Sequence, residues 1–191
     1  MFEVVAQGHR LRPQVEATIR ATFRRDHGAQ LASLPRWLVA STDEVGVICA
    51  ASLRFAADGF FSEHYLDQPI EQLITERTGA HPDRSALAEV GSLSAGRPGE
   101  IGELVRGIIN FLQARGTRWA FFTATARLRT FLGRAGIPLL ELAPADPARI
   151  ATAEAWGNYY QKDPRVMLVG DGMLADRRRQ AASLVESCHH A

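Results

Sequence analysis

The sequence predicts an α/β (α+β) fold in which helices cover both faces of a twisted, mixed sheet. Two apolar runs, 37–40 and 45–56, flank the polar, glycine-containing turn 43–46, and this pattern is typical of an antiparallel hairpin. From residue 87 onward, apolar runs alternate with stretches of helical periodicity, which is typical of βαβ units with parallel strands. Antiparallel strands followed by βαβ units predict one mixed sheet.

Two helices are expected in the first half of the chain. Residues 13–27 begin with Pro13, which suits a first helical turn, and they place apolar residues at four-residue steps. Residues 69–74 place three apolar side chains on one helical face and predict a short helix. Residues 75–86 are rich in charge, glycine and proline, so we expect a surface loop there.

The clearest element is a helix over residues 101–112, where apolar residues follow steps of three and four until Gly116 ends the pattern. The remaining elements are expected as strands at 87–94, 119–122, 138–142 and 165–169, and as helices at 126–135, from Asp146 toward Trp156, and from Met173 into the tail. No repeat, low-complexity segment or linker interrupts this order. We therefore expect one domain over residues 1–191, with 170–191 forming a C-terminal helix and tail.

The segment 95–99 contains two glycines and a proline and interrupts the chain directly after the strand expected at 87–94. The strand at 119–122 is expected beside it. We predict that these two central strands splay apart and leave a V-shaped cleft.

Composition excludes several classes of protein. The chain has 191 residues, of which 46% are hydrophobic and 23% charged, and its formal net charge of +1 predicts no general attraction to nucleic acid or to an anionic membrane. No run approaches the roughly 18 apolar residues of a membrane span, and the first residues lack the features of a signal peptide. We expect a cytoplasmic protein without integral membrane association. Histidines are scattered and no HExxH or CxxC spacing is present, so no metal site is expected.

A strand, a glycine-containing loop and a long amphipathic helix follow one another at residues 87–112. The N-terminus of such a helix presents unpaired backbone N–H groups and the positive end of the helix dipole, which favour a phosphate. Arg97 offers further donors to the same anion, and Gly99 lets the backbone approach it. The alternative is an ordinary βα turn in which the glycines serve geometry alone.

Glu89 lies inside an apolar strand, where an ionised carboxylate is paired or has a raised pKa. A carboxylate with a raised pKa near a phosphate-binding loop suits a general base that takes a proton from an amine. The alternative is a structural ion pair with Arg54, on a neighbouring expected strand.

Other polar groups each have two interpretations. Thr123 and Thr125 precede a helix and suit its cap, or else contact a ligand. Tyr159 and Tyr160 offer a phenol as a general acid, or else pack as an aromatic pair. The segment 60–66 mixes aromatic and polar residues and predicts either a lining for an acyl group or a loop that covers the core.

Several ordered blocks resemble the thermostable hemolysin family. They are residues 61–67, 89–94, 122–125, 136–139, 142–147, 156–160 and 164–167. That family is in turn similar, more weakly, to the acyl-homoserine-lactone synthases and to the wider GNAT acyltransferases. The resemblance implies a GNAT-like sheet with splayed central strands.

Two motifs of the related enzymes are incomplete here. In the synthases an arginine-bearing strand precedes a Glu-x-Ser-Arg pattern. Arg54 corresponds to the arginine of that strand and Glu89 to the glutamate of the pattern, but Leu93 follows Ser92 where the pattern has its arginine. Residues 97–102 do not match the Gln/Arg-x-x-Gly-x-Gly/Ala spacing that GNAT enzymes use for the pantetheine phosphate. The segment 130–133 lacks the usual GNAT tyrosine, which leaves Tyr159 or Tyr160 as the phenolic acid.

The resemblance implies an N-acyltransferase that moves an acyl group from an acyl-CoA or an acyl-carrier-protein thioester to a small amine. The phosphopantetheine thioester is a co-substrate, so no permanently bound cofactor is expected. Glu89 is the expected base, backbone N–H groups of Leu93, Ser94 and Ala95 are expected to hold the thioester oxygen, and Arg97 the phosphate. Two alternatives are a membrane-active hemolysin, as the family name implies, and a GNAT-shaped module that binds an acyl group or its carrier without turnover.

Overall fold

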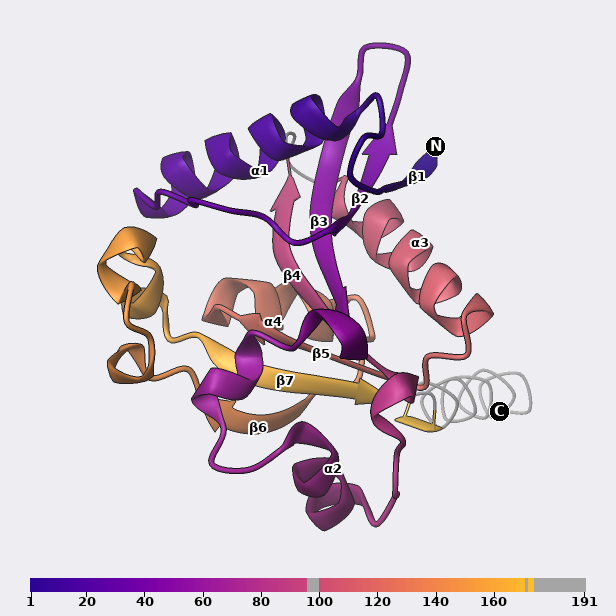
Figure 1. Cartoon of the computed structure of the whole chain (residues 1–191), viewed down its shortest axis with the longest axis vertical. Coiled ribbons are helices and arrows are strands. Elements are labelled where there is room, and N and C mark those ends of the chain that lie inside the picture. The colour runs from indigo at the N-terminus through magenta and orange to yellow at the C-terminus, as the bar shows by residue number, and fades with distance from the viewer. Residues whose placement is uncertain (96–99, 171, 174–191) are drawn as a thin grey trace, which may run out of the picture.

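The computed structural model describes residues 1–95, 100–170 and 172–173 of the chain (Figure 1). Within these residues seven strands form one sheet. In spatial order they are β1 (Phe2–Val5), β2 (Trp37–Thr42), β3 (Val47–Phe55), β4 (Leu87–Ala95), β5 (Trp119–Ala124), β7 (Arg165–Gly170) and β6 (Leu140–Pro144). The α-helices are α1 (Arg12–His27), α2 (Ile70–Thr78), α3 (Ile101–Ala114) and α4 (Ala126–Arg134).

The sheet is mixed, as the order of elements predicts. Strands β1 to β4 pair antiparallel, β4 and β5 pair parallel, and β7 pairs antiparallel with both β5 and β6. The parallel pair is joined through α3, which is the βαβ unit that the sequence indicates.

The central strands splay apart. Strand β4 pairs with β5 only over residues 87–89, opposite 119–121, whereas it stays paired with β3 as far as Ala95. The predicted splay of the central strands is therefore confirmed, and it begins directly after Glu89.

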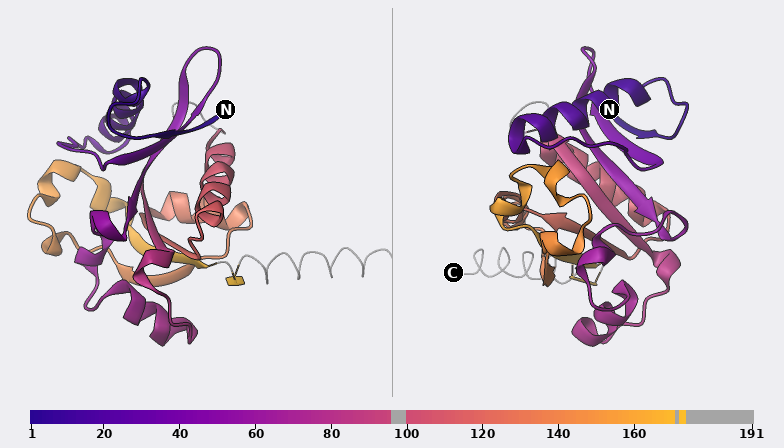
Figure 2. Two further views of the ribbon diagram at one scale, coloured as in Figure 1. Left: turned by 45° about the vertical axis from the view of Figure 1, so that its right-hand side comes forward. Right: turned by 60° about the vertical axis from the view of Figure 1, so that its left-hand side comes forward.

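Helices cover both faces of the sheet, and the two views of Figure 2 show α1 and α3 on opposite sides. On one face, Val15, Ile19 and Phe23 of α1 pack on β1, β2 and β3. On the other face, Leu104, Ile108 and Leu112 of α3 pack on alternate residues of β2, β3 and β4. Because side chains alternate along a strand, Ala88 and Val90 of β4 face α3, whereas Glu89 between them faces the other side of the sheet.

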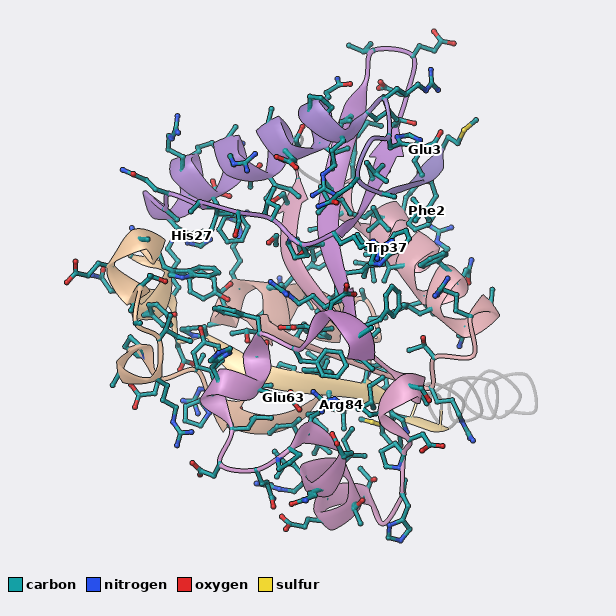
Figure 3. The ribbon with its side chains drawn as sticks, in the orientation of Figure 1. Phe2, Glu3, His27, Trp37, Glu63 and Arg84 are labelled. Atoms are coloured by element: carbon teal, nitrogen blue, oxygen red, sulfur yellow. The ribbon has the colours of Figure 1, made fainter. Side chains whose placement is uncertain are left out.

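A third apolar cluster holds α2 and the segment before it against β4, β5 and β7. In that segment the 3₁₀ turn η2 (Ser62–Tyr65) is tied to α2 by Arg84, whose guanidinium donates to Glu63 and Glu71 (2.7 and 2.9 Å; Figure 3). The carboxylate of Glu63 also accepts the first backbone N–H of α2, at Ile70 (3.2 Å). These contacts fix the position of η2 under the splayed strands.

Two local expectations were wrong, and one strand, β1, was not predicted. Helix α2 continues through part of the predicted loop 75–86 and ends at Gly79, whose left-handed backbone (φ 72°) suits a helix terminus, because its added polar residues lie on the solvent face. The four residues of β1 form an edge strand too short to show a periodic pattern. The helix expected from Asp146 toward Trp156 is replaced by 3₁₀ turns.

The 3₁₀ turns keep their own short-range backbone hydrogen bonds, and further bonds to α1 and to the chain directly after it hold the segment in place. The N–H of Gln30 donates to Ala155 (2.7 Å) and the N–H of Asn158 donates to His27 (2.8 Å). A side chain at Gly157 would overlap the carbonyl oxygen of His27. The helix predicted from Met173 into the tail lies outside the described residues, apart from 173 itself.

Candidate active site

A cavity of about 1220 Å³ occupies the splay between β4 and β5. Side chains from both faces of the sheet line it, because the opened strands no longer separate the two faces there. The walls come from α1 and the segment 152–162 on one side and from α3 and α4 on the other.

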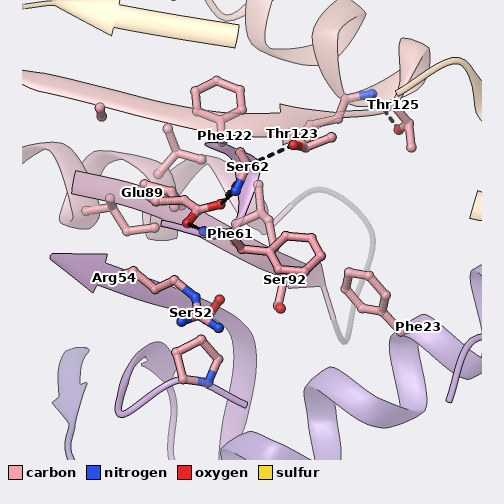
Figure 4. A pocket seen from close by; sticks show the side chains of 18 of the residues that line it. Phe23, Ser52, Arg54, Phe61, Ser62, Glu89, Ser92, Phe122, Thr123 and Thr125 are labelled. Carbon is pink, nitrogen blue, oxygen red and sulfur yellow. Dashed lines mark hydrogen bonds between the residues drawn. The ribbon is translucent and has the colours of Figure 1, made fainter. Parts of the chain in front are cut away.

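Glu89 lies at the point where the splay begins, with 4% of its surface exposed. Its carboxylate accepts three hydrogen bonds: from the backbone N–H of Phe61 (2.6 Å), from the backbone N–H of Ser62 (2.8 Å) and from the Ser62 hydroxyl (2.6 Å). Figure 4 shows these contacts at the edge of the cavity. The N-terminal end of η2 thus surrounds one carboxylate with donors.

Burial raises the pKa of Glu89, because removal from water disfavours the charged carboxylate. The hydrogen bonds from Ser62 and Phe61 and the charge of Arg54 oppose this effect without cancelling it. A buried carboxylate that lines a cavity and holds its proton more tightly than usual has the properties of a general base for an amine.

Arg54 is the direct cross-strand neighbour of Glu89 in the β3–β4 ladder. It is half-buried and lines the cavity, and the only hydrogen bond of its side chain to a described residue is a long one to the carbonyl oxygen of Asp58 (3.5 Å). It forms no salt bridge with any described residue. The predicted alternative, a structural ion pair of Glu89 with Arg54, is not what holds Glu89, since Phe61 and Ser62 make the direct contacts.

The two threonines have different surroundings. The hydroxyl of Thr123 lies 2.8 Å from that of Ser62, and so extends the hydrogen-bonded group around Glu89 across to β5. Thr125 is the N-cap residue of α4, and its hydroxyl accepts a long hydrogen bond from the backbone N–H of Leu128 (3.5 Å). Both residues line the cavity.

Strand β4 carries a bulge where it leaves β5. Gly91 pairs with Ser52 and Ser94 pairs with Ala50, so Ser92 and Leu93 stand opposite a single residue of β3. Ser92 has a positive φ of 49°, which reorients the backbone at this point. The edge of β4 that faces the cavity is therefore not paired with β5.

The residues expected to hold the thioester oxygen and the phosphate do not all lie at the cavity. Leu93 and Ala95 line the cavity, whereas the side chain of Ser94 is fully buried and donates to the carbonyl oxygen of Ser92 (2.9 Å). Arg97 and Gly99 lie outside the described residues.

The two tyrosines point in different directions. Tyr159 lines the cavity and donates to the backbone carbonyl of Thr123 (3.2 Å), and burial raises its pKa. The hydroxyl of Tyr160 lies 2.8 Å from that of Tyr65, and Tyr160 is not among the residues that line the cavity. The structure therefore brings Tyr159 to the site, together with Tyr65, which belongs to the segment 60–66 that the sequence indicates as a possible lining.

An aromatic wall closes the same side of the cavity as Glu89. We define it as Phe23, His27, Phe61, Trp156 and Tyr159, all of which line the cavity. Trp156 stacks on Phe61 (5.6 Å between ring centroids) and His27 lies edge-on to Tyr159 (5.1 Å). Burial lowers the pKa of His27, and its Nδ1 is buried without a hydrogen-bond partner among the described residues. Its members come from three distant segments, so no sequence spacing predicts the wall.

An apolar groove forms the opposite side of the cavity. We define it as the lining residues of α3 and α4 together with Phe122 of β5, namely Val105, Ile108, Ile109, Leu112, Phe122, Leu128, Phe131 and Leu132. Its hydrocarbon surface suits an acyl chain. The cavity thus has a polar and aromatic half and an apolar half, which meet at the splay.

Among the described residues no group of three or more histidines, cysteines or acidic residues is arranged to hold a metal ion. Over the same part of the chain, no helix combines the length and hydropathy that crossing a bilayer requires.

Solved structures share this fold. The N-acyl amino acid synthase FeeM, from uncultured soil microbes, is 10% identical with a TM-score of 0.62, over 89% of this chain and 90% of that one. The AHL synthase LasI is 9% identical (TM-score 0.59, 89% of each chain). The CoA-dependent acyl-homoserine lactone synthase BjaI, solved with SAM and isopentyl-CoA, is 11% identical (TM-score 0.59, 94% of this chain and 88% of that one).

At these identities the likeness shows a common fold, and it confirms the GNAT-like sheet that the resemblance implied. No curated protein matches the sequence. The family model for thermostable hemolysin matches residues 5–173, which is most of the chain, and the protein therefore belongs to the thermostable hemolysin family.

Proposed function

We propose that this protein is an N-acyltransferase that moves an acyl group from an acyl-CoA or acyl-carrier-protein thioester to a small amine. The observation that carries the proposal is the position of Glu89: a buried carboxylate with a raised pKa, at the point where the polar and apolar halves of one cavity meet. The fold shared with FeeM, LasI and BjaI supports it.

In the proposed reaction the amine nitrogen attacks the thioester carbonyl carbon, so that a C–N bond forms and the C–S bond breaks. Glu89 accepts the proton that the nitrogen loses, directly or through a water, and passes it to solvent. The thiolate leaves. Backbone N–H groups along the unpaired edge of β4, near Leu93 and Ala95, stabilise the negative charge that develops on the carbonyl oxygen.

We propose for Tyr159 a role other than that of the phenolic acid expected from the sequence. Its raised pKa makes it a poorer acid than a thiol, whose ordinary pKa is about 8.5. We therefore assign Tyr159 to hydrogen bonding and packing beside the reacting groups. Tyr160, whose ring lies edge-on to that of Tyr159, is assigned to the hydrogen bond with Tyr65.

The donor is proposed to place its acyl chain in the apolar groove and its phosphate near the start of α3. Arg97 is the proposed phosphate contact, so Arg97→Ala is expected to raise the Kd of the donor about 10- to 150-fold, the scale of one charged hydrogen bond. Calorimetric titration with CoA and with an acyl carrier protein decides between the two donors. If Arg97→Ala leaves the Kd of both donors unchanged, Arg97 is not the phosphate contact.

The proposal is tested by measuring free thiol release from decanoyl-CoA and from a decanoyl carrier protein, with a panel of small amines, followed by mass spectrometry of the amide. Amine-dependent thiol release that disappears in Glu89→Gln is the expected result. Tight binding of the thioester without thiol release would instead indicate a binding module. Dye release from liposomes without any thioester would indicate direct membrane activity.

A further inference from the structure

The cation near the proposed base has no anionic partner among the described residues. Arg54 is half-buried and lines the cavity, yet the only hydrogen bond of its side chain among the described residues is the 3.5 Å contact with the carbonyl of Asp58. The other half-buried arginines among the described residues all bond to carboxylates: Arg12 and Arg20 to Glu16, Arg84 to Glu63, and Arg129 and Arg165 to Asp163. An arginine is rarely enclosed without a carboxylate or phosphate to accept its donors.

Its place in the sheet relates Arg54 directly to Glu89. The two residues are cross-strand partners in the β3–β4 ladder and both line the cavity, on the face that carries α1. The Cα atoms of such partners lie only about 4.5–5.5 Å apart. Figure 4 shows the Arg54 guanidinium beside Ser52, whereas the carboxylate of Glu89 contacts Phe61 and Ser62. A cation and a base therefore occupy neighbouring positions on one face of the sheet, and the groups that bond to the carboxylate of Glu89 are Phe61 and Ser62, not Arg54.

An acceptor that fits this pair carries an amine and a carboxylate on the same carbon atom. The aromatic wall lies on the same side of the cavity as the pair and offers an apolar surface to whatever else the acceptor carries. We infer that the acceptor is an α-amino acid with an apolar side chain, whose carboxylate binds Arg54 and whose amine faces Glu89. This inference rests on the proposed function, since it names the acceptor of that reaction.

The proposed position of the thioester donor keeps its phosphate and its acyl chain away from Arg54. A phosphate placed at the start of α3 lies beyond the end of β4 at Ala95, whereas Arg54 pairs with Glu89 near the other end of the strand. The apolar groove, which is proposed to hold the acyl chain, is on the face of α3 and α4. Arg54 thus belongs to the acceptor half of the cavity.

The test compares each amino acid with the amine that lacks its carboxyl group: leucine with 3-methylbutylamine, and phenylalanine with 2-phenylethylamine, with decanoyl-CoA or the carrier-protein thioester as donor. For the wild-type protein we expect kcat/KM to be about 10- to 100-fold higher for the amino acid of each pair. Arg54→Ala should remove this difference by lowering kcat/KM for the amino acids alone, and Arg54→Lys should restore part of it. Arg77→Ala, an exposed arginine on α2, is the control and should leave all four values unchanged.

Three outcomes overturn the inference or separate it from the proposed function. Equal use of both members of each pair by the wild-type protein overturns the inference while the acyltransferase activity stands. Equal loss for acids and amines in Arg54→Ala also overturns it, because it assigns Arg54 to the donor or to folding. If no amine is acylated, calorimetry with leucine and phenylalanine alone decides: carboxylate-dependent binding that Arg54→Ala abolishes supports the amino-acid site without the reaction, and absence of binding rejects both.

Discussion

Ser62 gives Glu89 two hydrogen bonds, one from its backbone N–H and one from its hydroxyl (2.8 and 2.6 Å). With the N–H of Phe61 they place three donors around one carboxylate, and none of these donors is a cation. An ion pair would have neutralised the charge, whereas these donors orient the carboxylate and leave its pKa raised. The carboxylate of Glu89 is therefore held in a fixed position and can still accept a proton.

Replacement of Glu89 by glutamine should abolish acyl transfer and also weaken the fold. The amide NH₂ would face a backbone N–H of Phe61 or Ser62, so one donor loses its acceptor, at a cost of about 1–3 kcal/mol in the free energy of unfolding. Urea unfolding and thiol release measure the two effects separately. Glu103→Gln, at an exposed position on α3, is the matched control and should change neither. Retained turnover in a folded Glu89→Gln protein would return Glu89 to a structural role.

The raised pKa of Glu89 has a defined effect on stability. The folded state binds more protons than the unfolded state between the ordinary pKa of 4.5 and the raised value. The difference in free energy of unfolding, wild type minus Glu89→Gln, should therefore fall as the pH rises through this window and level off above it. Urea unfolding of both proteins from pH 4 to pH 8 measures the difference, in which the contributions of other groups cancel. A difference that rises with pH would mean that the hydrogen bonds outweigh burial and lower the pKa.

Periodicity made most of the fold predictable, because the strands and helices that build the core must repeat their apolar residues at fixed steps. Helix α3 is the clearest case: the predicted span, 101–112, lies within the observed Ile101–Ala114. The 3₁₀ turns after β6 could not be predicted, since their conformation depends on bonds to His27 and Gln30, which are remote in sequence.

The candidate site was predictable only in part, for a related reason. Glu89 is conspicuous because a charge interrupts an apolar strand. The groups that hold it at Phe61 and Ser62 are largely backbone N–H groups, which every residue other than proline has, so no residue type marks them. The aromatic wall needs the folded chain to bring α1, η2 and the segment around Trp156 together.

The apolar groove should set the length of acyl chain that the enzyme accepts. Ile109→Trp adds bulk to the α3 side of the groove at a half-exposed position. We expect kcat/KM for decanoyl-CoA to fall about tenfold or more, on the scale of an overpacked site, while acetyl-CoA is used as before. Phe111→Trp, on the same helix but outside the cavity lining, is the control. Equal effects of Ile109→Trp on both donors would place the acyl chain elsewhere.

Gly157 joins the aromatic wall to the end of α1. Its φ of 56° is a backbone conformation that favours glycine, and a Cβ there would overlap the carbonyl oxygen of His27. Gly157→Ala should therefore reduce the free energy of unfolding by about 1–3 kcal/mol. Because Trp156 precedes Gly157 and stacks on Phe61, the substitution should also displace the wall and raise the KM for the amine acceptor more than the KM for the thioester.

Gly133→Ala is the matched control for this prediction, because Gly133 lies in α4 with no atom close to the position of an added Cβ. Alanine favours a helix over glycine by up to about 1 kcal/mol, so this variant should unfold at the same or a higher urea concentration than the wild type. If both variants unfold alike, Gly157 does not hold the wall in place. Gly157→Ala could instead lower stability and raise the KM for the amine and the KM for the thioester equally. That result would mean that the aromatic wall supports the whole cavity, and it would contradict a specific contribution of Trp156 to acceptor binding.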